Sequence, residues 1–514
     1  MKIKYLLAVS LSILFSTFLS AQSQGPEIRR CGVGLEDGAL IKERMLENRR
    51  TIPQAAVDQF VNSRATKYIP VKVHVIGNSN GEGYVSIDNV LKMICDMNED
   101  YASQDIRFYF KDVTTSIRFA NNQNVYNDGA SFAAQSYMIS NKSPNCMNIY
   151  VSQSVNNQVA SYYTGFGDFI FMLNQMTADG GTGSHEAGHF FSLPHTFYGW
   201  EGVDHTQYAN NNVPSSVSGS TTERTARSGS CSNCASAADG FCDTPADYYS
   251  DRIACSHNLG IKDACSVPIA PESSLLMSYF ADNCVDSFSP EQKNAVAADI
   301  LSRGWNTFTS PNPSNVVSGS GVTATSPANG ANVPLSDVTI TWSPVTGATA
   351  YVLVVQRTLF GTPVEDVVKT IVYGSNSYTI PQAMLAQPRT YSWKVKPFNQ
   401  LNTCSAYSST FSFNTTSLPS GLETNFSESA ELRILSNPVN SPMAEVLINV
   451  PQEMVSGIKI YAMDGKQVAN IENVQLFAGD NVQLLDVSTL NAGMYMVVVS
   501  TEKGSLQQKL MINK

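Results

Sequence analysis

The chain has 514 residues, of which 15% are charged, and it carries a formal net charge of −10. At roughly 100–200 residues per domain, this length predicts about three or four domains, and a hydrophobic fraction of 43% is ample for packed cores. An acidic, lightly charged chain argues against nucleic acid as a partner.

Residues 1–21 have the pattern of a secretory signal peptide. Lys2 and Lys4 give a basic start, residues 5–19 are apolar, and Ser20-Ala21 offers a small-residue cleavage site. The alternative, an uncleaved anchor helix, is disfavoured because the apolar run is short. No other run of about 18 or more apolar residues occurs, so no transmembrane span is expected.

The next part of the chain predicts a polar prosegment at 22–65 followed by a compact domain at 66–309. Apolar spacing predicts helices at 86–103 and 289–303, capped by Ser86 and by a Ser289–Gln292 capping box. Apolar, β-branched runs predict strands at 69–76, 105–113, 147–153 and 169–173. Residues 198–270 are rich in Gly, Ser, Asn and Asp and predict loops.

Two further units of short strands follow. Residues 310–321 have the composition of a linker and precede a β-rich unit at 322–415. A second polar linker at 416–431 leads to another β-rich unit at 432–514. The fold class expected is α+β, with a mixed sheet in the first domain and two all-β modules after it.

The strongest chemical signal is HEAGHFFSLPH, residues 185–195. On a helix, His185 and His189 are neighbours on one face and can both bind one metal ion. Pro194 turns the chain back, which can bring His195 in as a third ligand. Three ligands plus water make an open, catalytic zinc site rather than a closed structural one.

Glu186 lies one position round the helix and can reach a water on such an ion. Zinc lowers the pKa of that water to about 7, and Glu186 would act as general base for attack on a peptide carbonyl. A bare HExxH can also be a helix with ordinary packed histidines. The third histidine argues against that reading, and the intact Glu186 argues against a pseudoenzyme.

HEAGHFFSLPH resembles the extended zinc signature of the metzincins, HExxHxxGxxH. SSLLMSYF (273–280) resembles their Met-turn, which implies Met277 as a hydrophobic floor under the zinc and Tyr279 as a stabiliser of the tetrahedral intermediate. DGFCDTPAD (239–247) and NCVDSFSPEQ (283–292) are similar to segments of the pappalysin family, as is the strand IPVKVHVI. The resemblance covers about residues 66–307 and implies a metzincin-like zinc peptidase fold.

The chain departs from the signature at Ser192, where glycine is favoured because the helix ends in a left-handed turn. A serine in that conformation costs about 1 kcal/mol, which leaves the placing of His195 open. Asp204 or His205 is the alternative third ligand.

The family resemblance also implies calcium near the Asp-Thr-Pro segment. Hard oxygen ligands are available from Asp239, Asp243, Thr244 and Asp247. The alternative is a solvated acidic loop.

The ten cysteines of an exported chain should mostly be paired. If Cys95 pairs with Cys146, and the six cysteines at 231–284 pair among themselves, Cys31 and Cys404 are left over. Cys231-x-x-Cys234 could instead suggest a structural zinc, although disulfides are favoured in this compartment.

Cys31 lies in the prosegment, and a thiolate is a good zinc ligand. We expect Cys31 to occupy the fourth zinc position as a latency switch, as cysteines do in some metzincins, until the prosegment is cut at Arg50 or Arg64. The alternative is a disulfide from Cys31 to Cys404.

Residues 323–414 resemble a fibronectin type III module, with Trp342 at its core tryptophan. Residues 432–514 resemble the C-terminal sorting domain of the type IX secretion system, on LSNPVN, GIKIYAMDGKQV, LNAGMYMVVV and KLMINK. The resemblance implies the secretion machinery as a partner, an extracellular or outer-surface location, and attachment to surface lipopolysaccharide as one fate after the domain is removed. The alternative is a small adhesive β-domain.

Two functions from different classes follow. The first is a secreted zinc endopeptidase that acts on extracellular proteins or peptides. The second is a non-enzymatic surface adhesin with a degenerate peptidase scaffold. The full set of histidines and Glu186 favour the first.

Overall fold

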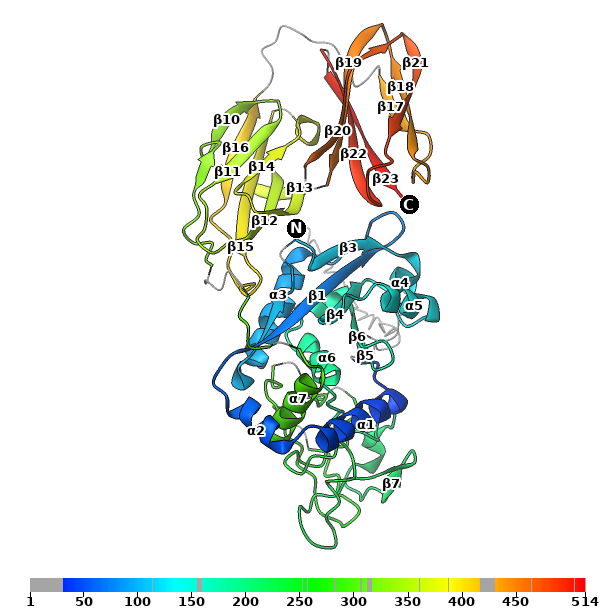
Figure 1. Ribbon diagram of the computed structural model, residues 1–514, viewed down its shortest axis with the longest axis vertical. Helices are drawn as coiled ribbons and strands as arrows, with labels where there is room; N and C mark the ends of the chain where they lie inside the picture. The colour runs from blue at the N-terminus through cyan, green and yellow to red at the C-terminus, as the bar shows by residue number, and fades with distance from the viewer. Residues whose placement is uncertain are drawn as a thin grey trace, which may run out of the picture.

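The computed structural model describes residues 31–513 except 113, 155–159, 252, 257, 282, 306, 312–316, 360, 387, 417–429, 464 and 503. The predicted signal peptide lies outside these residues, as do the start of the predicted prosegment and parts of both predicted linkers. Figure 1 shows helices and loops gathered at one end of the molecule and strands at the other. No helix among the described residues is long and apolar enough to cross a membrane.

The N-terminal helical segment, residues 31–65, contains α1 (Leu35–Thr51) and α2 (Gln54–Asn62). Both helices pack against α7 (Pro290–Ser302), near the other end of the α/β region. α1 buries Gly38, Ile41, Met45 and Asn48, which recur every three or four positions and so share one face. The segment is therefore a docked part of the structure.

The α/β region, residues 66–309, is built on a six-stranded sheet in the order β2-β1-β4-β6-β5, with β3 also pairing with β1. Its pairs are parallel except β5–β6, which is antiparallel at the edge. β4 and β6 are buried at every position because both faces are covered, which explains their continuous apolar runs. The strands are β1 (Lys67–Gly77), β2 (Ile106–Phe110), β3 (Ile117–Asn121), β4 (Met147–Ser152), β5 (Ser161–Thr164) and β6 (Phe169–Leu173).

The helices of this region begin where the sequence predicts caps. The Ser86 side chain caps α3 (Ile87–Asp100), and Ser289 with Gln292 forms the capping box of α7. α3 ends at Asp100 and β2 ends at Phe110, each three residues before its predicted end. Elements that the sequence reading missed are β3, β5, and the short helices α4 (Gln123–Asn127) and α5 (Phe132–Ser140).

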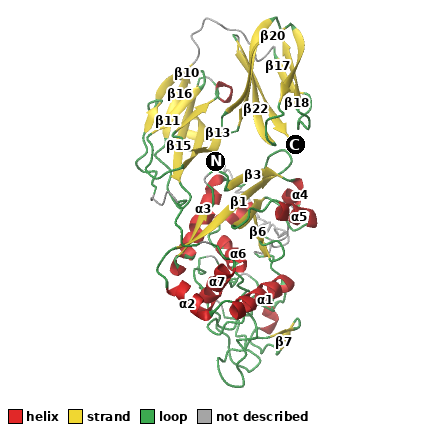
Figure 2. Cartoon of the chain, in the orientation of Figure 1, coloured by secondary structure: helices red, strands yellow, loops and turns green. Residues whose placement is uncertain are grey.

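After α6 (Thr182–Phe190), the chain from 191 to 289 is mostly loop (Figure 2), and this stretch includes the loops predicted at 198–270. Its described part holds the two-residue strands β7 (Ser216–Val217) and β8 (Ser220–Thr221) and the 3₁₀ turn η3 (His205–Tyr208). The six cysteines pair among themselves, which confirms that expectation. The bonds are Cys231–Cys265, Cys234–Cys242 and Cys255–Cys284.

The first β module is a sandwich of two sheets, β10-β16-β15-β12-β13 and β14-β11-β9. Trp342 and Trp393 lie at its centre, each at most 1% exposed. β13, half of it exposed, was missed by the sequence reading. The strands are β9 (Ala324–Ser326), β10 (Ala331–Pro334), β11 (Val338–Trp342), β12 (Ala350–Leu359), β13 (Thr362–Tyr373), β14 (Ser377–Ile380), β15 (Arg389–Phe398) and β16 (Phe411–Thr416).

This module is joined to the α/β region by core and covalent contacts. In β12, Tyr351 and Leu353 face the module's own core, whereas Val352 and Val354 belong to the core of the α/β region. A disulfide links Cys95 of α3 to Cys404. The expected Cys95–Cys146 pair is therefore wrong, and so is the alternative bond from Cys31 to Cys404. All ten cysteines are described, and the two without a disulfide are Cys31 and Cys146.

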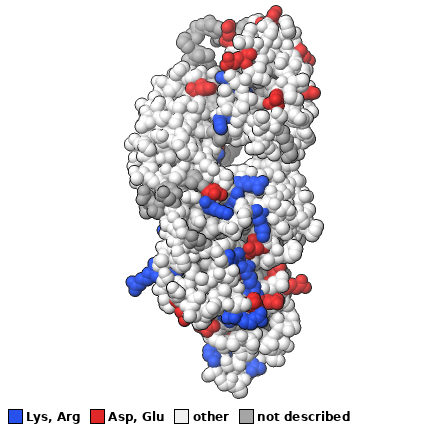
Figure 3. Space-filling view, viewed as in Figure 1, with Lys and Arg blue, Asp and Glu red and all other residues white. Residues whose placement is uncertain are grey.

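The second β module packs a three-stranded sheet, β17-β18-β21, on a four-stranded sheet, β20-β19-β22-β23, around a core of its own. Its strands are β17 (Glu431–Ile434), β18 (Met443–Val450), β19 (Met454–Ala462), β20 (Gln467–Leu476), β21 (Gly479–Asp486), β22 (Gly493–Thr501) and β23 (Gly504–Ile512). On the face drawn in Figure 3, basic and acidic side chains lie close together over the α/β region, and the first β module is largely uncharged.

Candidate metal centre

The turn after α6 decides whether three histidines can meet. Ser192 has a φ of 63°, the left-handed conformation that glycine would adopt more easily. The Ser192 amide donates to the His189 carbonyl and the Leu193 amide to the Gly188 carbonyl, the two bonds of a Schellman motif. This motif reverses the chain within three residues and returns His195 to the helix face that carries His185 and His189.

The three histidines converge with a fourth residue, Cys31 of the N-terminal helical segment. One ligand atom from each of these four buried side chains lies within 4.8 Å of all the others. The Nε2 atoms of His189 and His195 are 3.1 Å apart, and Cys31 Sγ is 3.5 Å from His189 Nε2. Tetrahedral zinc, with bonds of about 2.0 Å to nitrogen and about 2.3 Å to sulfur, requires an N–N separation of about 3.3 Å and an N–S separation of about 3.5 Å. The donor set therefore fits zinc.

Hydrogen bonds at Nδ1 fix which nitrogen of each ring, Nε2, faces the other possible ligands. Nδ1 of His185 donates to the Leu276 carbonyl at 2.6 Å, and Nδ1 of His189 donates to the Leu193 carbonyl at 2.7 Å. His195 Nδ1 lies 3.0 Å from a carboxylate oxygen of Glu201. A proton on each Nδ1 leaves the Nε2 lone pairs pointing together, an arrangement that repels without a cation. Burial, and then His195, lowers the pKa of His189 well below its usual value.

Cys31 is held in place by the edge strand β5 and by Tyr279. The amide of Gly32 donates to the carbonyl of Ser161 at 2.6 Å, and the Tyr279 hydroxyl donates to the Cys31 carbonyl at 3.2 Å. Burial, and then the neighbouring Glu186 carboxylate, raises the pKa of the Cys31 thiol well above its usual value. Only a strong local cation can keep this sulfur as a thiolate.

Glu186 is fully buried beside this cluster. The Ser161 hydroxyl donates to its Oε1 at 2.6 Å. Ser161 therefore holds both the Cys31 segment, through its carbonyl, and Glu186, through its side chain. The sequence reading missed Ser161 because β5 is only four residues long and has no alternation.

Met277 packs against α6 at Gly188. A Cβ placed on Gly188 would lie 2.3 Å from the sulfur of Met277, so the helix can approach the methionine only through a glycine. The preceding carbonyl, of Leu276, is the acceptor for His185. The ring of Tyr279 lies 5.0 Å from that of His195.

A buried carboxylate braces the two loops that supply these groups. Asp247 accepts from the hydroxyls of Thr196, next to His195, and Ser278, next to Met277, at 2.6 and 2.7 Å. Its other oxygen accepts from the amide of Tyr249. Asp247 is 2% exposed, and the sequence offered its Asp-Thr-Pro-containing segment only as a calcium candidate.

The four candidate calcium ligands do not point at a common place. Asp243 accepts from Ser289 and the Glu291 amide at the start of α7, and Asp247 is engaged as described above. Asp239 accepts from the Thr244 hydroxyl, and its pKa is raised by burial and then by Glu223. Burial also raises the pKa of Glu223, to about 7.

The alternative third ligands lie elsewhere. Asp204 accepts from the amide and hydroxyl of Thr206, and His205 packs on the ring of Tyr249 at 5.1 Å. Neither belongs to the cluster of possible metal ligands formed among the described residues. His195 occupies the third position instead.

Comparisons with known proteins bear mainly on the C-terminal module. No curated protein sequence matches the chain. A promirolysin mutant from Tannerella forsythia is similar at 17% identity over 52% of this chain and 93% of its own, with a TM-score of 0.35. The FN1–FN3 domains of chicken CNTN1 are similar at 17% identity over 39% of this chain and 68% of theirs, with a TM-score of 0.15. Scores this low establish no shared fold.

Residues 435–513 match the family model of the secretion system C-terminal sorting domain. This match covers the second β module, whose sandwich has its own core. The second β module is therefore a type IX sorting domain, and the protein is exported to the cell surface or the extracellular space.

Proposed function

We propose that the protein is a secreted zinc-dependent endopeptidase of the metzincin type, similar to the pappalysins, and that it is made as a latent precursor. The observation that carries the proposal is the convergence of His185, His189 and His195 beside a buried Glu186. Ring orientation, fixed by three separate acceptors, supports zinc rather than a set of packed histidines.

A zinc ion bound there would lower the pKa of a bound water to about 7 and polarise a peptide carbonyl. Glu186 takes the proton of the attacking water and later gives it to the leaving amine. Ser161 orients the carboxylate of Glu186 through a hydrogen bond. Tyr279, freed from the Cys31 carbonyl, donates to the developing oxyanion. The outer edge of β5, which the Cys31 segment contacts in the precursor, takes an extended substrate.

Latency follows from the same geometry. Cys31 holds the position that water needs, and the carbonyl of Cys31 occupies Tyr279. Of the two candidate cuts, Arg50 lies inside α1, whereas Arg64 lies in the exposed connector between α2 and β1. Proteases cut extended chain, so we propose that activation begins with a cut at Arg64, which removes the covalent link between the prosegment and the rest of the protein.

The calcium part of the proposal rests on Asp239 and Glu223. Both carboxylates are buried, and Glu223 lies close enough to Asp239 to raise its pKa further. A divalent cation between them would relieve that repulsion. Asp243 and Asp247 are engaged elsewhere and are not part of this reduced set.

The test is hydrolysis of casein or gelatin by protein from which the prosegment has been removed, with wild type and Glu186→Gln compared at equal zinc content. We expect the substitution to lower kcat/KM at least about 1,000-fold, a general-base and charge effect, with zinc retained at about one per chain. A Cys31→Ala precursor should be active without any cut.

Zinc bound by both proteins without hydrolysis of any substrate would leave a zinc-binding scaffold, as the adhesin interpretation expects. No zinc in either protein would overturn the proposal. A Cys31→Ala precursor that stays fully latent would overturn the switch alone.

A further inference from the structure

We propose that Asp168 and Asp299 form a guanidinium receptor that binds the prosegment through Arg44, independently of the metal centre, and that retains the prosegment after the connector has been cut. A regulatory role for this binding rests on the proposed peptidase activity, whereas the binding itself does not. The receptor joins three elements of the α/β region: α7 supplies Asp299, β5 supplies Tyr163, and the turn between β5 and β6 supplies Asp168.

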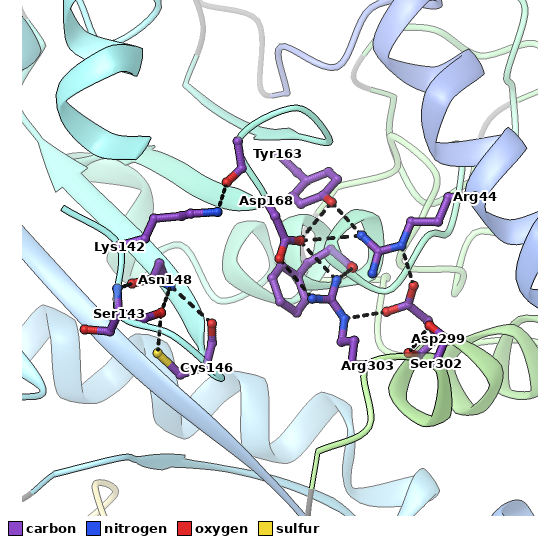
Figure 4. A network of polar contacts seen from close by, with 12 residues as sticks. Arg44, Lys142, Ser143, Cys146, Asn148, Tyr163, Asp168, Asp299, Ser302 and Arg303 are labelled. Carbon is purple, nitrogen blue, oxygen red and sulfur yellow. Dashed lines mark hydrogen bonds and ion pairs between the residues drawn. The ribbon is translucent and has the colours of Figure 1, made fainter. Parts of the chain in front are cut away.

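Arg44 reaches from α1 into this receptor (Figure 4). Its Nε lies 2.8 Å from Asp299 Oδ1, and its NH1 donates to the Tyr163 hydroxyl at 3.0 Å and lies 3.5 Å from Asp168 Oδ1. Asn48, one helical turn on, donates to the same Asp299 oxygen at 3.0 Å. A planar guanidinium suits binding to several acceptors at once because its N–H groups point in fixed directions.

The charges show why the receptor needs a cation from outside the α/β region. Arg303 already binds both carboxylates, with Nε 2.7 Å from Asp299 Oδ2 and NH1 3.1 Å from Asp168 Oδ2. One arginine balances only one of the two carboxylates, and Asp299 is fully buried. Both hydrogen bonds that we identify to Asp299 Oδ1 come from the prosegment. Departure of the prosegment removes both of these bonds and leaves Arg303 as the one arginine shared by two carboxylates, so rebinding of Arg44 restores the charge balance.

The receptor is also preformed. Asp168 has a φ of 49°, a left-handed conformation that the turn imposes, and Tyr163 donates to it at 3.1 Å. Burial alone would raise the pKa of Asp168, but Arg303 and then Arg44 hold it below its usual value. Arg303 also donates to the Phe190 carbonyl at the end of α6, so the receptor is tied to the helix that carries the histidines.

Two other basic residues of α1 dock nearby. Lys42 donates to the Ala238 carbonyl at 2.6 Å, and Arg49 donates to the Gly240 carbonyl at 2.9 Å and lies over the ring of Phe241. These contacts go mainly to backbone oxygens, so they position the helix. Arg44 is the residue whose charge the receptor needs, whereas Arg50, with 76% of its side chain exposed, contacts only Glu47 of its own helix.

The experiment uses the full precursor carrying Glu186→Ala, with the recognition sequence of a specific protease inserted in the exposed connector 63–66. After the cut, gel filtration and mass spectrometry measure how much prosegment fragment stays bound, with and without a zinc chelator. The variants are Arg44→Ala, Arg44→Lys, Cys31→Ser and the matched control Arg50→Ala. Activity plays no part in the readout, so failure of the proposed peptidase leaves this test intact.

We expect the fragment to stay bound in the parent protein, in Arg50→Ala and in Cys31→Ser, even with chelator. Arg44→Ala should release the fragment at least ten times faster than the parent protein. The release rate of Arg44→Lys should lie between the two, because lysine keeps the positive charge but lacks the planar set of N–H donors of arginine. Asp168→Asn tests the same contact from the other side if Arg44→Ala folds poorly. Equal release from Arg44→Ala and Arg50→Ala, or complete release from Cys31→Ser, would overturn the proposal.

Discussion

Residues 191–289 and the two β modules differ in what holds their backbones. The β modules are ladders of long strands with continuous cores. The described part of 191–289 has almost no regular structure and depends on three disulfides and on buried side chains such as Asp247. The comparison teaches that specific contacts in an irregular backbone place His195, Met277 and Tyr279 beside the helix α6, whereas the two β modules carry none of the candidate ligands.

The contact between the α/β region and the first β module offers the strongest way to test this division. Replacing Cys95 and Cys404 together by serine should lower the free energy of unfolding by about 4–5 kcal/mol, because the bond closes a loop of 309 residues. Differential scanning calorimetry should show that loss in the transition of the α/β region, with the sorting module unchanged. Cys146→Ala, at a buried cysteine outside any disulfide, is the control and should cost far less. An equal loss in the control would mean that the bond adds nothing.

Removal of the metal should destabilise the α/β region and leave the sorting module unaffected. A chelator applied to the precursor is expected to destabilise the α/β region by about 4 kcal/mol, the value for a ligand present at about 1,000 times its Kd. The sorting module has a separate core and should keep its melting temperature. His195→Gln should start lower and respond little to the chelator. A shift shared equally by both transitions would show that the chelator acts elsewhere.

The buried acidic pair Glu223 and Asp239 should make the stability of the α/β region depend on pH. Burial raises the pKa of Glu223 to about 7, and Asp239 is raised by burial and then by Glu223. A carboxyl whose folded pKa is raised contributes stability below its unfolded pKa and loses it as pH rises through the folded value. Without calcium, the α/β region should therefore lose on the order of 1–2 kcal/mol between pH 5 and pH 8, measured from thermal melts.

Calcium should reverse that loss at pH 8, because a cation favours both ionised carboxylates. Glu223→Gln should flatten the pH dependence and remove the response to calcium. An unchanged melting temperature at pH 8 after treatment with a calcium-selective chelator would rule out the calcium site. The β modules, which lack a comparable buried acidic pair among their described residues, serve as the internal reference.

The smallest expected effect is at Ser192. Ser192→Gly should raise the free energy of unfolding by about 1 kcal/mol, since glycine adopts a φ of 63° without the Cβ penalty. It also removes a buried hydroxyl that has no hydrogen-bond partner among the described residues. Chemical denaturation measures the gain, and Ser218→Gly, an exposed serine with a φ of 48°, is the matched control for the turn alone. A loss of stability in Ser192→Gly would show instead that the serine side chain stabilises the folded protein.

Much of the α/β fold and of the histidine cluster could be predicted because the signals are local. Spacing of four residues places His185 and His189 on one face, and capping residues mark the starts of α3 and α7. The remainder depends on contacts distant in sequence. The partner of Cys95 lies 309 residues away, and β5 is recognisable only from its pairing with β6. Glu201, which orients His195, has no sequence pattern that distinguishes it from a surface glutamate.

The Cys95–Cys404 disulfide also divides the peptide bonds of this chain into those between the two cysteines and those outside them. A cut anywhere between these residues leaves both pieces attached, so a nick in the 310–321 linker yields one particle of two chains. A cut before Cys95 or after Cys404 leaves the terminal piece without a covalent link to the rest of the chain. The Arg64 connector and the 416–431 linker both lie outside the bridged span. Processing at either end can therefore break the covalent link to a terminal piece, whereas a single accidental cut within the bridged span separates no covalent piece.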